Sequence, residues 1–150
     1  MNDFKLVNCS SSVDLEYIRG VEDEFSIAFP PEYIELILNY NGGIPSEKKL
    51  ILNNGSYVVE RFLSFDPEYK TSIYGAYDIE VVWSQIEDRL PEDVIPIAVL
   101  FSGDMLCIDF RCANKSIVLW DHEESDSENF KITLVAKNFV EFTKLLTRLK

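Results

Sequence analysis

Paired cysteines, long apolar runs and an excess of basic residues are all missing from this chain of 150 residues. The three cysteines, Cys9, Cys107 and Cys112, are odd in number and show no CxxC spacing. A disulfide framework, or a zinc site built on paired cysteines, would need such spacings. The cysteines are typical of reduced thiols, and they indicate a cytoplasmic protein.

Features that direct a chain to a membrane are equally scarce. No apolar run approaches the roughly 18 residues that a membrane helix needs. The first residues, Met-Asn-Asp-Phe-Lys-Leu-Val-Asn, lack the basic segment and the apolar stretch of a signal peptide. We therefore expect a cytoplasmic location and no membrane partner.

Basic residues number 14 against 26 acidic ones, which gives a formal net charge of −12. A negative surface is repelled by the phosphates of nucleic acid and by anionic lipid headgroups. It attracts a basic protein over long distances and speeds the encounter. The charge argues against nucleic acid as a partner and allows a basic protein, although solubility alone also explains it.

Catalytic motifs are absent as well. The six glycines form neither a GxGxxG pattern nor a P-loop, and no G-x-S-x-G elbow occurs. The only histidine is His122, so a catalytic cysteine–histidine pair would join it to Cys107. If residues 105–122 form a hairpin, Cys107 lies opposite Leu119 or Trp120, and His122 is roughly 7–10 Å away at about 3.4 Å per residue. That is too far for an activated nucleophile, so we expect a buried thiol at Cys107.

Metal and glycosidase chemistry have no marked site either. The acids from Asp121 to Glu128 lack the spacing of an EF-hand loop, and one histidine without paired cysteines does not make a structural zinc site. Among the 26 acidic residues, no pair is marked out for glycoside hydrolysis. We expect no catalytic residue, no metal and no cofactor. The alternative is a hydrolase that uses Asp109, His122 or the neighbouring acids.

What the chain does contain is a globular composition, with 47% hydrophobic and 13% aromatic residues. Its length suits a single domain over residues 1–150, large enough to fold without disulfides or metal. Apolar residues recur at helical spacing in four segments. The expected buried stripes are Leu15-Ile18-Val21-Phe25, Tyr33-Leu36-Ile37-Tyr40, Ile79-Val82-Trp83-Ile86-Leu90 and Phe139-Phe142-Leu145-Leu146-Leu149.

Capping residues suggest where these helices begin and end. Ser11, with Asp14 three residues later, predicts a capping box before the first helix. Asn41-Gly42-Gly43 predicts the end of the second helix, because a left-handed residue after a helix favours glycine. Pro91 ends the third helix, and Asn138 predicts the N-terminal cap of the last.

Three apolar runs of strand length lie between Val94 and Glu123, each bounded by turn residues. Shorter strands are expected at 50–52 and 57–65, around the turn signal Asn53-Asn54-Gly55, and at 132–136. Strands and helices that are segregated and joined by hairpins indicate an α+β fold. We predict a single domain with a central, mainly antiparallel sheet flanked by about four helices.

Two groups of residues are candidates for partner binding. Five acids fall within eight residues after the central strands, and loops on a rigid scaffold are common binding elements. Tyrosines between residues 69 and 77, together with Trp83, are of the class enriched at binding hot spots. The alternatives are that the acidic residues form an ordinary solvated loop, that the tyrosines pack within their own loop, and that Trp83 packs in the core. The predicted partner-binding residues are Asp121, Glu123, Glu124, Asp126, Glu128, Tyr69, Tyr74 and Tyr77.

Several short motifs in a fixed order resemble one family. They are Phe29-Pro30 with Tyr33, Leu36, Tyr40 and Asn41-Gly42-Gly43; Ile95-Pro96-Ile97-Ala98, Gly103-Asp104 and Leu106-Cys107-Ile108-Asp109; Val118 and Trp120-Asp121-His122-Glu123; and Val135-Ala136, Asn138-Phe139 and Phe142. On these residues the chain resembles the SUKH superfamily, which includes fungal cell-wall synthesis regulators and many bacterial immunity proteins. It departs from that pattern at Phe101-Ser102, where many members carry an extra glycine or an acid, and residues 44–77 show no match.

The resemblance implies an α+β domain without catalytic activity. Bacterial members bind and neutralise a toxin, often a nuclease, that is delivered by a neighbouring cell or made in the same cell. Nuclease toxins are often basic, so an acidic inhibitor has a complementary charge. The resemblance therefore implies an immunity protein whose partner is a cognate, basic protein toxin. The alternative within the family is a regulatory protein-interaction scaffold.

Overall fold

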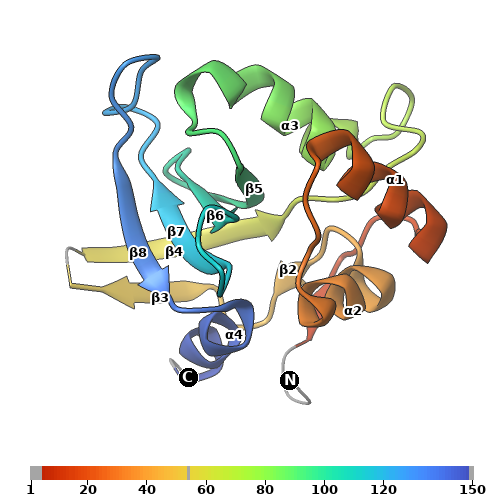
Figure 1. The fold of residues 1–150 in the computed structure, drawn as a ribbon. Helices are drawn as coiled ribbons and strands as arrows, with labels where there is room; N and C mark the ends of the chain where they lie inside the picture. The colour runs from red at the N-terminus through yellow and green to blue at the C-terminus, as the bar shows by residue number, and fades with distance from the viewer. Residues whose placement is uncertain (1–4, 54, 149–150) are drawn as a thin grey trace.

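A six-stranded antiparallel sheet forms the centre of the molecule (Figure 1). The computed structural model describes residues 5–53 and 55–148. The strands lie side by side in chain order. They are β3 (Lys49–Leu52), β4 (Gly55–Phe62), β5 (Val94–Leu100), β6 (Met105–Asp109), β7 (Ser116–Trp120) and β8 (Ile132–Ala136). The predicted α+β fold with a mainly antiparallel sheet is confirmed.

Helices cover the sheet from two sides. Figure 1 shows α3 above the sheet and α2 and α4 below it. The bounds are α1 (Leu15–Phe25), α2 (Pro31–Tyr40), α3 (Ile79–Ile86) and α4 (Phe139–Arg148), with short 3-10 turns η1 (Gly75–Tyr77) and η2 (Glu87–Arg89). Among the described residues, no helix is both long enough and apolar enough to span a membrane.

The predicted cap of α1 needs a correction. Asp14, not Ser11, caps this helix: its Oδ1 accepts a hydrogen bond from the backbone N of Tyr17 at 2.9 Å. The helix begins at Leu15, so Ser11 lies three residues too early to reach a free amide of the first turn. The predicted cap of α4 is confirmed, because Asn138 Oδ1 accepts a hydrogen bond from Glu141 N at 2.8 Å.

One position of the expected helical stripes is also wrong. Ile18 and Val21 of α1 are buried, but Leu15 is 43% exposed. The buried face passes instead through Glu22, whose Oε2 accepts a hydrogen bond from Phe29 N at 2.7 Å. A satisfied carboxylate can enter the core, so the buried face of α1 includes a charged position, whereas Leu15 is the first residue of the helix. Leu149 lies outside the described residues.

Alternate side chains of the central strands enter two different cores. Leu106 and Ile108 of β6 face the main core, which draws on residues from Leu6 to Leu146. Cys107 faces the other side of the sheet and packs in a smaller core beneath α3. The members of this smaller core are Ile86, Leu90, Val94, Cys107, Val118 and Trp120.

The register of the central hairpin differs by at least one residue from the prediction. Cys107 lies opposite Val118, not opposite Leu119 or Trp120. The ladder between β6 and β7 closes with Asp109 opposite Ser116, so the connection is residues 110–115, one position earlier in the chain than the predicted pairing of 105–110 with 117–122 placed it. The shift moves Cys107 still further from the end of β7.

Residues 44–65 hold the elements that the sequence predicted least well. A two-stranded sheet pairs β1 (Leu6–Val7) with β2 (Ile44–Pro45) and was not expected, because strands of two residues leave no periodic pattern. The predicted strand 57–65 begins earlier and ends at Phe62. Asn54 of the expected turn lies outside the described residues.

The direction of the strands separates the two candidate binding regions. Residues 121–131 leave the sheet at the end of β7, beside the turn that joins β5 to β6. β4 runs antiparallel to β5, whereas β7 runs parallel to β5. Residues 66–78, which follow β4, therefore lie at the end of the sheet opposite to residues 121–131. Figure 1 shows the two connections at opposite upper corners.

Candidate partner-binding surface

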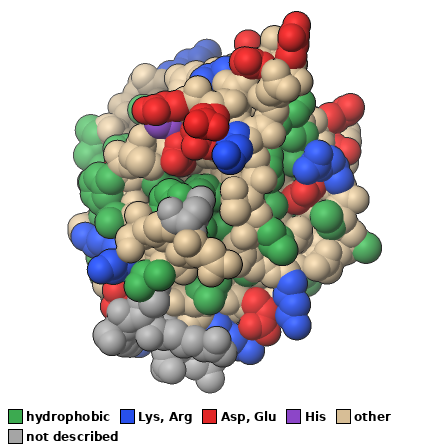
Figure 2. All heavy atoms as spheres, turned by 90° about the vertical axis from the view of Figure 1, so that its left-hand side faces the viewer, with side chains coloured by type: hydrophobic (Ala, Val, Ile, Leu, Met, Phe, Trp, Pro, Cys, Tyr) green, Lys and Arg blue, Asp and Glu red, His purple; other side chains and the backbone are tan. Residues whose placement is uncertain are grey.

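The five predicted acids lie in one connection between β7 and β8, residues 121–131, which we call the acidic loop. Glu123, Glu124, Asp126 and Glu128 are exposed, and Asp121 is half-buried. Figure 2 shows acidic side chains gathered around the histidine on this face of the molecule. The loop thus presents a concentrated negative charge to solvent.

Two of the acids also shape the loop. Asp121 Oδ1 accepts hydrogen bonds from the backbone N of Glu123 at 2.9 Å and of Glu124 at 3.0 Å. Asp126 Oδ1 accepts hydrogen bonds from the backbone N of Glu128 and of Asn129, both at 2.8 Å. These backbone donors lower the pKa of Asp126 from its ordinary value. Asp121 and Asp126 therefore hold two tight turns, and the exposed glutamates belong to these turns.

The far end of the loop is anchored as well. Ser125 is buried, and its Oγ accepts a hydrogen bond from Lys131 N at 2.9 Å. The Lys131 ammonium lies 3.6 Å from Glu124 Oε2 on the surface. An exposed pair of this kind contributes little stability, so the buried serine is the firmer anchor.

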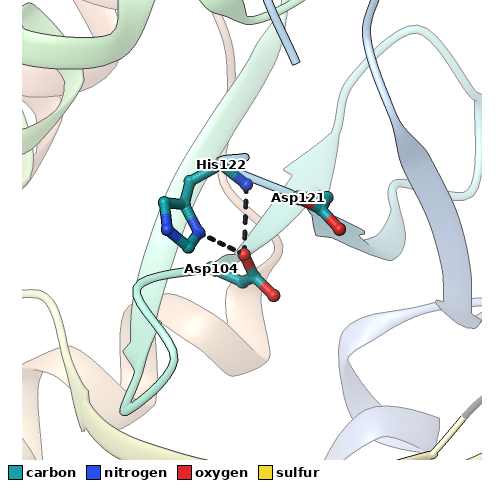
Figure 3. A group of neighbouring side chains, drawn as sticks. All are labelled: Asp104, Asp121 and His122. Atoms are coloured by element: carbon teal, nitrogen blue, oxygen red, sulfur yellow. Dashed lines mark hydrogen bonds and ion pairs between the residues drawn. The ribbon is translucent and has the colours of Figure 1, made fainter. Parts of the chain in front are cut away.

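His122 ties the near end of the loop to the turn between β5 and β6. Figure 3 shows Asp104 from that turn reaching toward His122, which follows β7. Asp104 Oδ1 lies 2.6 Å from His122 Nδ1 and accepts a hydrogen bond from His122 N at 3.1 Å. Asp104 is only 8% exposed, so the pair is partly shielded from water.

The surroundings of His122 fit the ring closely. Gly103 has φ +94°, and a Cβ there would approach His122 Cε1 to 3.2 Å, so glycine leaves room for the imidazole. Arg89 donates a hydrogen bond from Nη1 to His122 O at 3.3 Å, and its guanidinium lies over the Trp120 ring. The Gly-Asp and Trp-Asp-His sequences therefore meet at one junction that supports the acidic loop.

Asp104, Asp121 and His122 also form the one group of possible metal ligands found in the described residues, with one ligand atom of each within 4.8 Å of the others. Asp104 Oδ1 already accepts two hydrogen bonds from His122, and Asp121 Oδ1 accepts two backbone amides. In Figure 3 the Asp121 carboxylate points away from the imidazole. Support of the loop explains the grouping, and we assign no metal to it.

The structure keeps two of the candidate catalytic groups, Cys107 and Asp109, apart from His122. Cys107 is fully buried beneath α3, and this burial raises the pKa of its thiol. Asp109 lies at the other end of β6 from the Asp104–His122 pair. Its two carboxylate oxygens accept hydrogen bonds from the Arg111 guanidinium, both at 2.9 Å, which lower its pKa. His122 is thus brought together with neither Cys107 nor Asp109.

The three predicted tyrosines lie in residues 66–78, which we call the tyrosine segment. The rings of Tyr74 and Tyr77 lie 4.7 and 5.1 Å from the guanidinium of Arg61. Tyr77 donates its hydroxyl proton to Glu60 Oε2 at 2.6 Å; this hydrogen bond, followed by burial, raises the pKa of Tyr77. Tyr69 is 39% exposed. Partner binding by these tyrosines stays a prediction, but they share no continuous surface with the acidic loop.

A group of exposed apolar side chains beside the acidic loop was not predicted. Phe101 in the turn after β5 is 65% exposed, and its backbone N donates to Val58 O of β4 at 3.0 Å. Leu134 of β8 is 66% exposed. We call the group the apolar patch; it comprises Phe101 and its backbone partner Val58, Ile51 and Leu134, which line one cleft, and Phe130 of the acidic loop. A phenylalanine in the turn Phe-Ser-Gly-Asp was the one sequence signal that could have revealed it.

The comparison with known proteins gives a relative whose function is not described. The chain is 28% identical over 139 residues to a protein of Bacillus subtilis (strain 168), the SPbeta prophage-derived uncharacterized protein YokK. The match covers 85% of this chain and 71% of YokK.

A family comparison covers most of the chain. The sequence model of the family SUKH_6, described as SMI1-KNR4 cell-wall, matches residues 15–142. That range runs from the first residue of α1 into α4 and includes the junction of Gly103-Asp104 with Trp120-Asp121-His122. The resemblance noted from the sequence motifs is confirmed. The chain belongs to the SMI1-KNR4 cell-wall family, SUKH_6, of the SUKH superfamily.

Proposed function

We propose that this protein is a cytoplasmic, non-catalytic immunity protein that binds and neutralises a cognate, basic, nuclease-type toxin of a bacterial polymorphic toxin system. The observation that carries the proposal is the acidic loop: a firmly held connection whose glutamates project into solvent next to the apolar patch. Negative charge at the rim of a binding surface steers a basic partner toward it. The apolar side chains beside the loop provide surface that the complex can bury.

Two further observations support the proposal. Family membership favours a protein partner, and the similarity to a prophage-derived protein, YokK, fits a gene that travels with elements of conflict between bacteria. The candidate catalytic groups Cys107, Asp109 and His122 lie apart, so the described geometry favours binding over turnover.

A regulatory scaffold is the second candidate, because the family description refers to the cell wall. The adjacent gene distinguishes the two proposals. A neighbouring gene that encodes a toxin favours immunity, and a neighbouring cell-wall gene favours regulation. Co-expression with the neighbouring toxin should protect the cell, and the two proteins should co-purify. Without protection and without a complex, the immunity proposal would be lost.

The role of the acidic loop has its own experiment. One variant combines the substitutions Glu123→Gln, Glu124→Gln and Glu128→Gln. It keeps Asp121 and Asp126, because these residues form the turns of the loop. Association with the toxin at low salt should slow about tenfold and depend less on salt. The matched control is Glu16→Gln, Glu24→Gln and Glu35→Gln on α1 and α2, which changes the net charge equally. Equal slowing in both variants would mean that only overall charge matters.

A further inference from the structure

The two edges of the six-stranded sheet face each other on one side of the molecule. Within the described residues, β3 pairs only with β4 and β8 pairs only with β7. Figure 1 shows both edge strands on the left, above α4. A cleft of about 340 Å³ lies between them, lined by residues of β3, β8 and α4 that include Ile51, Leu134 and Leu145.

The hydrogen-bond pattern shows which groups β8 presents at its free edge. Asp121 N donates to Lys131 O at 3.1 Å, which makes this a hydrogen-bonded pair of the antiparallel ladder with β7. Hydrogen-bonded pairs alternate with non-hydrogen-bonded pairs along an antiparallel ladder. Because the register is continuous from Trp120–Ile132 to Val118–Leu134, these two pairs are non-hydrogen-bonded. The N–H and C=O groups of Ile132 and Leu134 therefore point outward, away from β7.

Apolar side chains accompany these outward backbone groups. Leu134 is 66% exposed, and Ile51 across the cleft is 52% exposed. Ile132 lies two residues from Leu134, on the same face, and packs against the smaller core. A register shift after Leu134 ends the regular ladder, so the available frame is residues 132–134. Native proteins commonly protect such an edge because another strand can pair with it.

Charge along β8 indicates which kind of strand fits. The acidic loop, with five acids against Lys131, precedes the strand, and the exposed Lys137 follows it. A segment antiparallel to β8 has its C-terminal end beside the acidic loop. Complementary charge then requires basic residues at that end, after alternating apolar residues that face the cleft, with an acid near the start.

We propose that the free edge of β8 binds an extended segment of the protein partner as an additional antiparallel strand. The backbone of the segment bonds to Ile132 and Leu134, its apolar side chains enter the cleft, and its following basic residues lie beside the acidic loop. Strand addition is an established mode of peptide recognition. The identity of the partner as a basic protein rests on the proposed function, whereas the free edge does not.

The probe is a synthetic peptide, acetyl-Glu-Thr-Val-Thr-Val-Thr-Arg-Lys-amide, added to ¹⁵N-labelled protein. Amide hydrogen exchange is followed by NMR. With saturating peptide, the amides of Ile132 and Leu134 should exchange at least about tenfold more slowly, because unpaired edge amides exchange fast in the free protein. The amide of Thr133, already directed to β7, should not change. A peptide with the charges at its ends exchanged should bind more weakly.

Three controls test the edge directly. A peptide that is N-methylated on the amides facing β8 should no longer protect the amides of Ile132 and Leu134 from exchange. This control leaves the protein unaltered. Leu134→Pro removes one outward donor, which an edge strand tolerates, and should lose binding while thermal unfolding confirms its fold. Lys49→Pro is the matched change on β3, outside the cleft, because Val59 N donates to Lys48 O at 2.8 Å and alternation turns the N–H of Lys49 outward. This variant should bind the peptide normally.

Three results would overturn the inference. They are unchanged exchange at Ile132 and Leu134, equal binding of the N-methylated peptide, or protection in the free protein that rises with its concentration, which would place a second copy on the edge. The peptide experiment contains no toxin, so its failure concerns the edge of β8 alone. Absence of a complex with the toxin would count against the proposed function alone.

Discussion

The acidic loop and the tyrosine segment are both connections that the sequence marks for partner binding, yet they use their side chains differently. In the acidic loop, Asp121 and Asp126 hold the backbone, and the exposed glutamates of their turns project into solvent. In the tyrosine segment, the rings of Tyr74 and Tyr77 are occupied by Arg61. A connection is available for binding only where its side chains are not already needed for its own structure.

Arg61 explains the difference. It is 6% exposed, and it donates hydrogen bonds to Gly42 O at 3.0 Å and Asn8 O at 2.6 Å. A buried guanidinium needs partners on every side, and the tyrosine rings cover one of its faces. Within the tyrosine segment, Tyr69 and Ile73, which is 88% exposed, are the large hydrophobic residues that are exposed.

The largest expected effect removes the support of the acidic loop. Trp120 is 1% exposed, and its Nε1 donates to Arg89 O at 2.9 Å. Trp120→Ala should lower the free energy of unfolding by about 3–5 kcal/mol, because a cavity forms beneath α3. Urea denaturation measures it. Trp120→Phe, which keeps most of the ring, should cost clearly less. Equal losses would shift the cause from packing to the lost indole hydrogen bond.

The next largest effect is expected when Arg61, which packs against the tyrosine segment, is replaced. Arg61→Met should lower the free energy of unfolding by about 2–4 kcal/mol, because the carbonyl oxygens of Gly42 and Asn8 lose their donor and that of Gly42 is buried. Amide exchange in residues 66–78 should accelerate, while exchange in the acidic loop stays unchanged. Arg61→Lys serves as the control and should recover only part of the stability, since an ammonium cannot replace the planar fork. Similar acceleration in both connections would mean that they are not independent.

A smaller effect concerns the hydroxyl of Tyr77. Tyr77→Phe should cost about 0.5–1.5 kcal/mol through the lost hydrogen bond to Glu60. The folded state raises the pKa of Tyr77, so this stabilisation is complete below the unfolded pKa of about 10 and is lost as pH rises through the folded pKa. The two proteins should therefore converge in stability at alkaline pH. A gap that is constant from pH 7 to pH 11 would contradict this.

The smallest effect is expected in the acidic loop itself. The combined Glu123→Gln, Glu124→Gln and Glu128→Gln variant should change the free energy of unfolding by under about 0.5 kcal/mol for each substitution, because the side chains are exposed. Thermal unfolding at low and high salt measures it. A loss of several kcal/mol would show that the glutamates support the fold as Arg61 does, and the contrast between the two connections would disappear.

Much of the fold was predictable because it rests on local patterns. The stripe of α2, the cap at Asn138 and the apolar runs of β5 to β7 follow from periodicity and turn residues. The register of Cys107 was not predictable, because the alternation of side chains along a strand repeats every two residues and does not fix where the turn lies in the chain. The burial of Glu22 depends on a contact with Phe29, seven residues away, which periodicity does not record.

The candidate site divides in the same way. Its composition is local: the acids of the loop follow one another, so sequence alone predicts their concentration. Its boundary is not local, because Phe101 comes from the turn after β5, while Ile51 and Leu134 come from two other strands. Their exposure depends on which part of the sheet α3 leaves uncovered. The packing of Tyr74 and Tyr77 on Arg61 is not local either, because Arg61 lies at least 13 residues earlier in the chain.

The sequence by itself determined the α+β class, the family and the negative charge of the loop, because helical periodicity, motif order and formal charge are properties of neighbouring residues. Only the tertiary structure decided that His122 holds Asp104 and not Cys107, that the tyrosines cover Arg61, and that the edges of β3 and β8 border one cleft. Each of these contacts joins residues that are distant in the chain, and the register and order of the strands in the sheet bring those residues together.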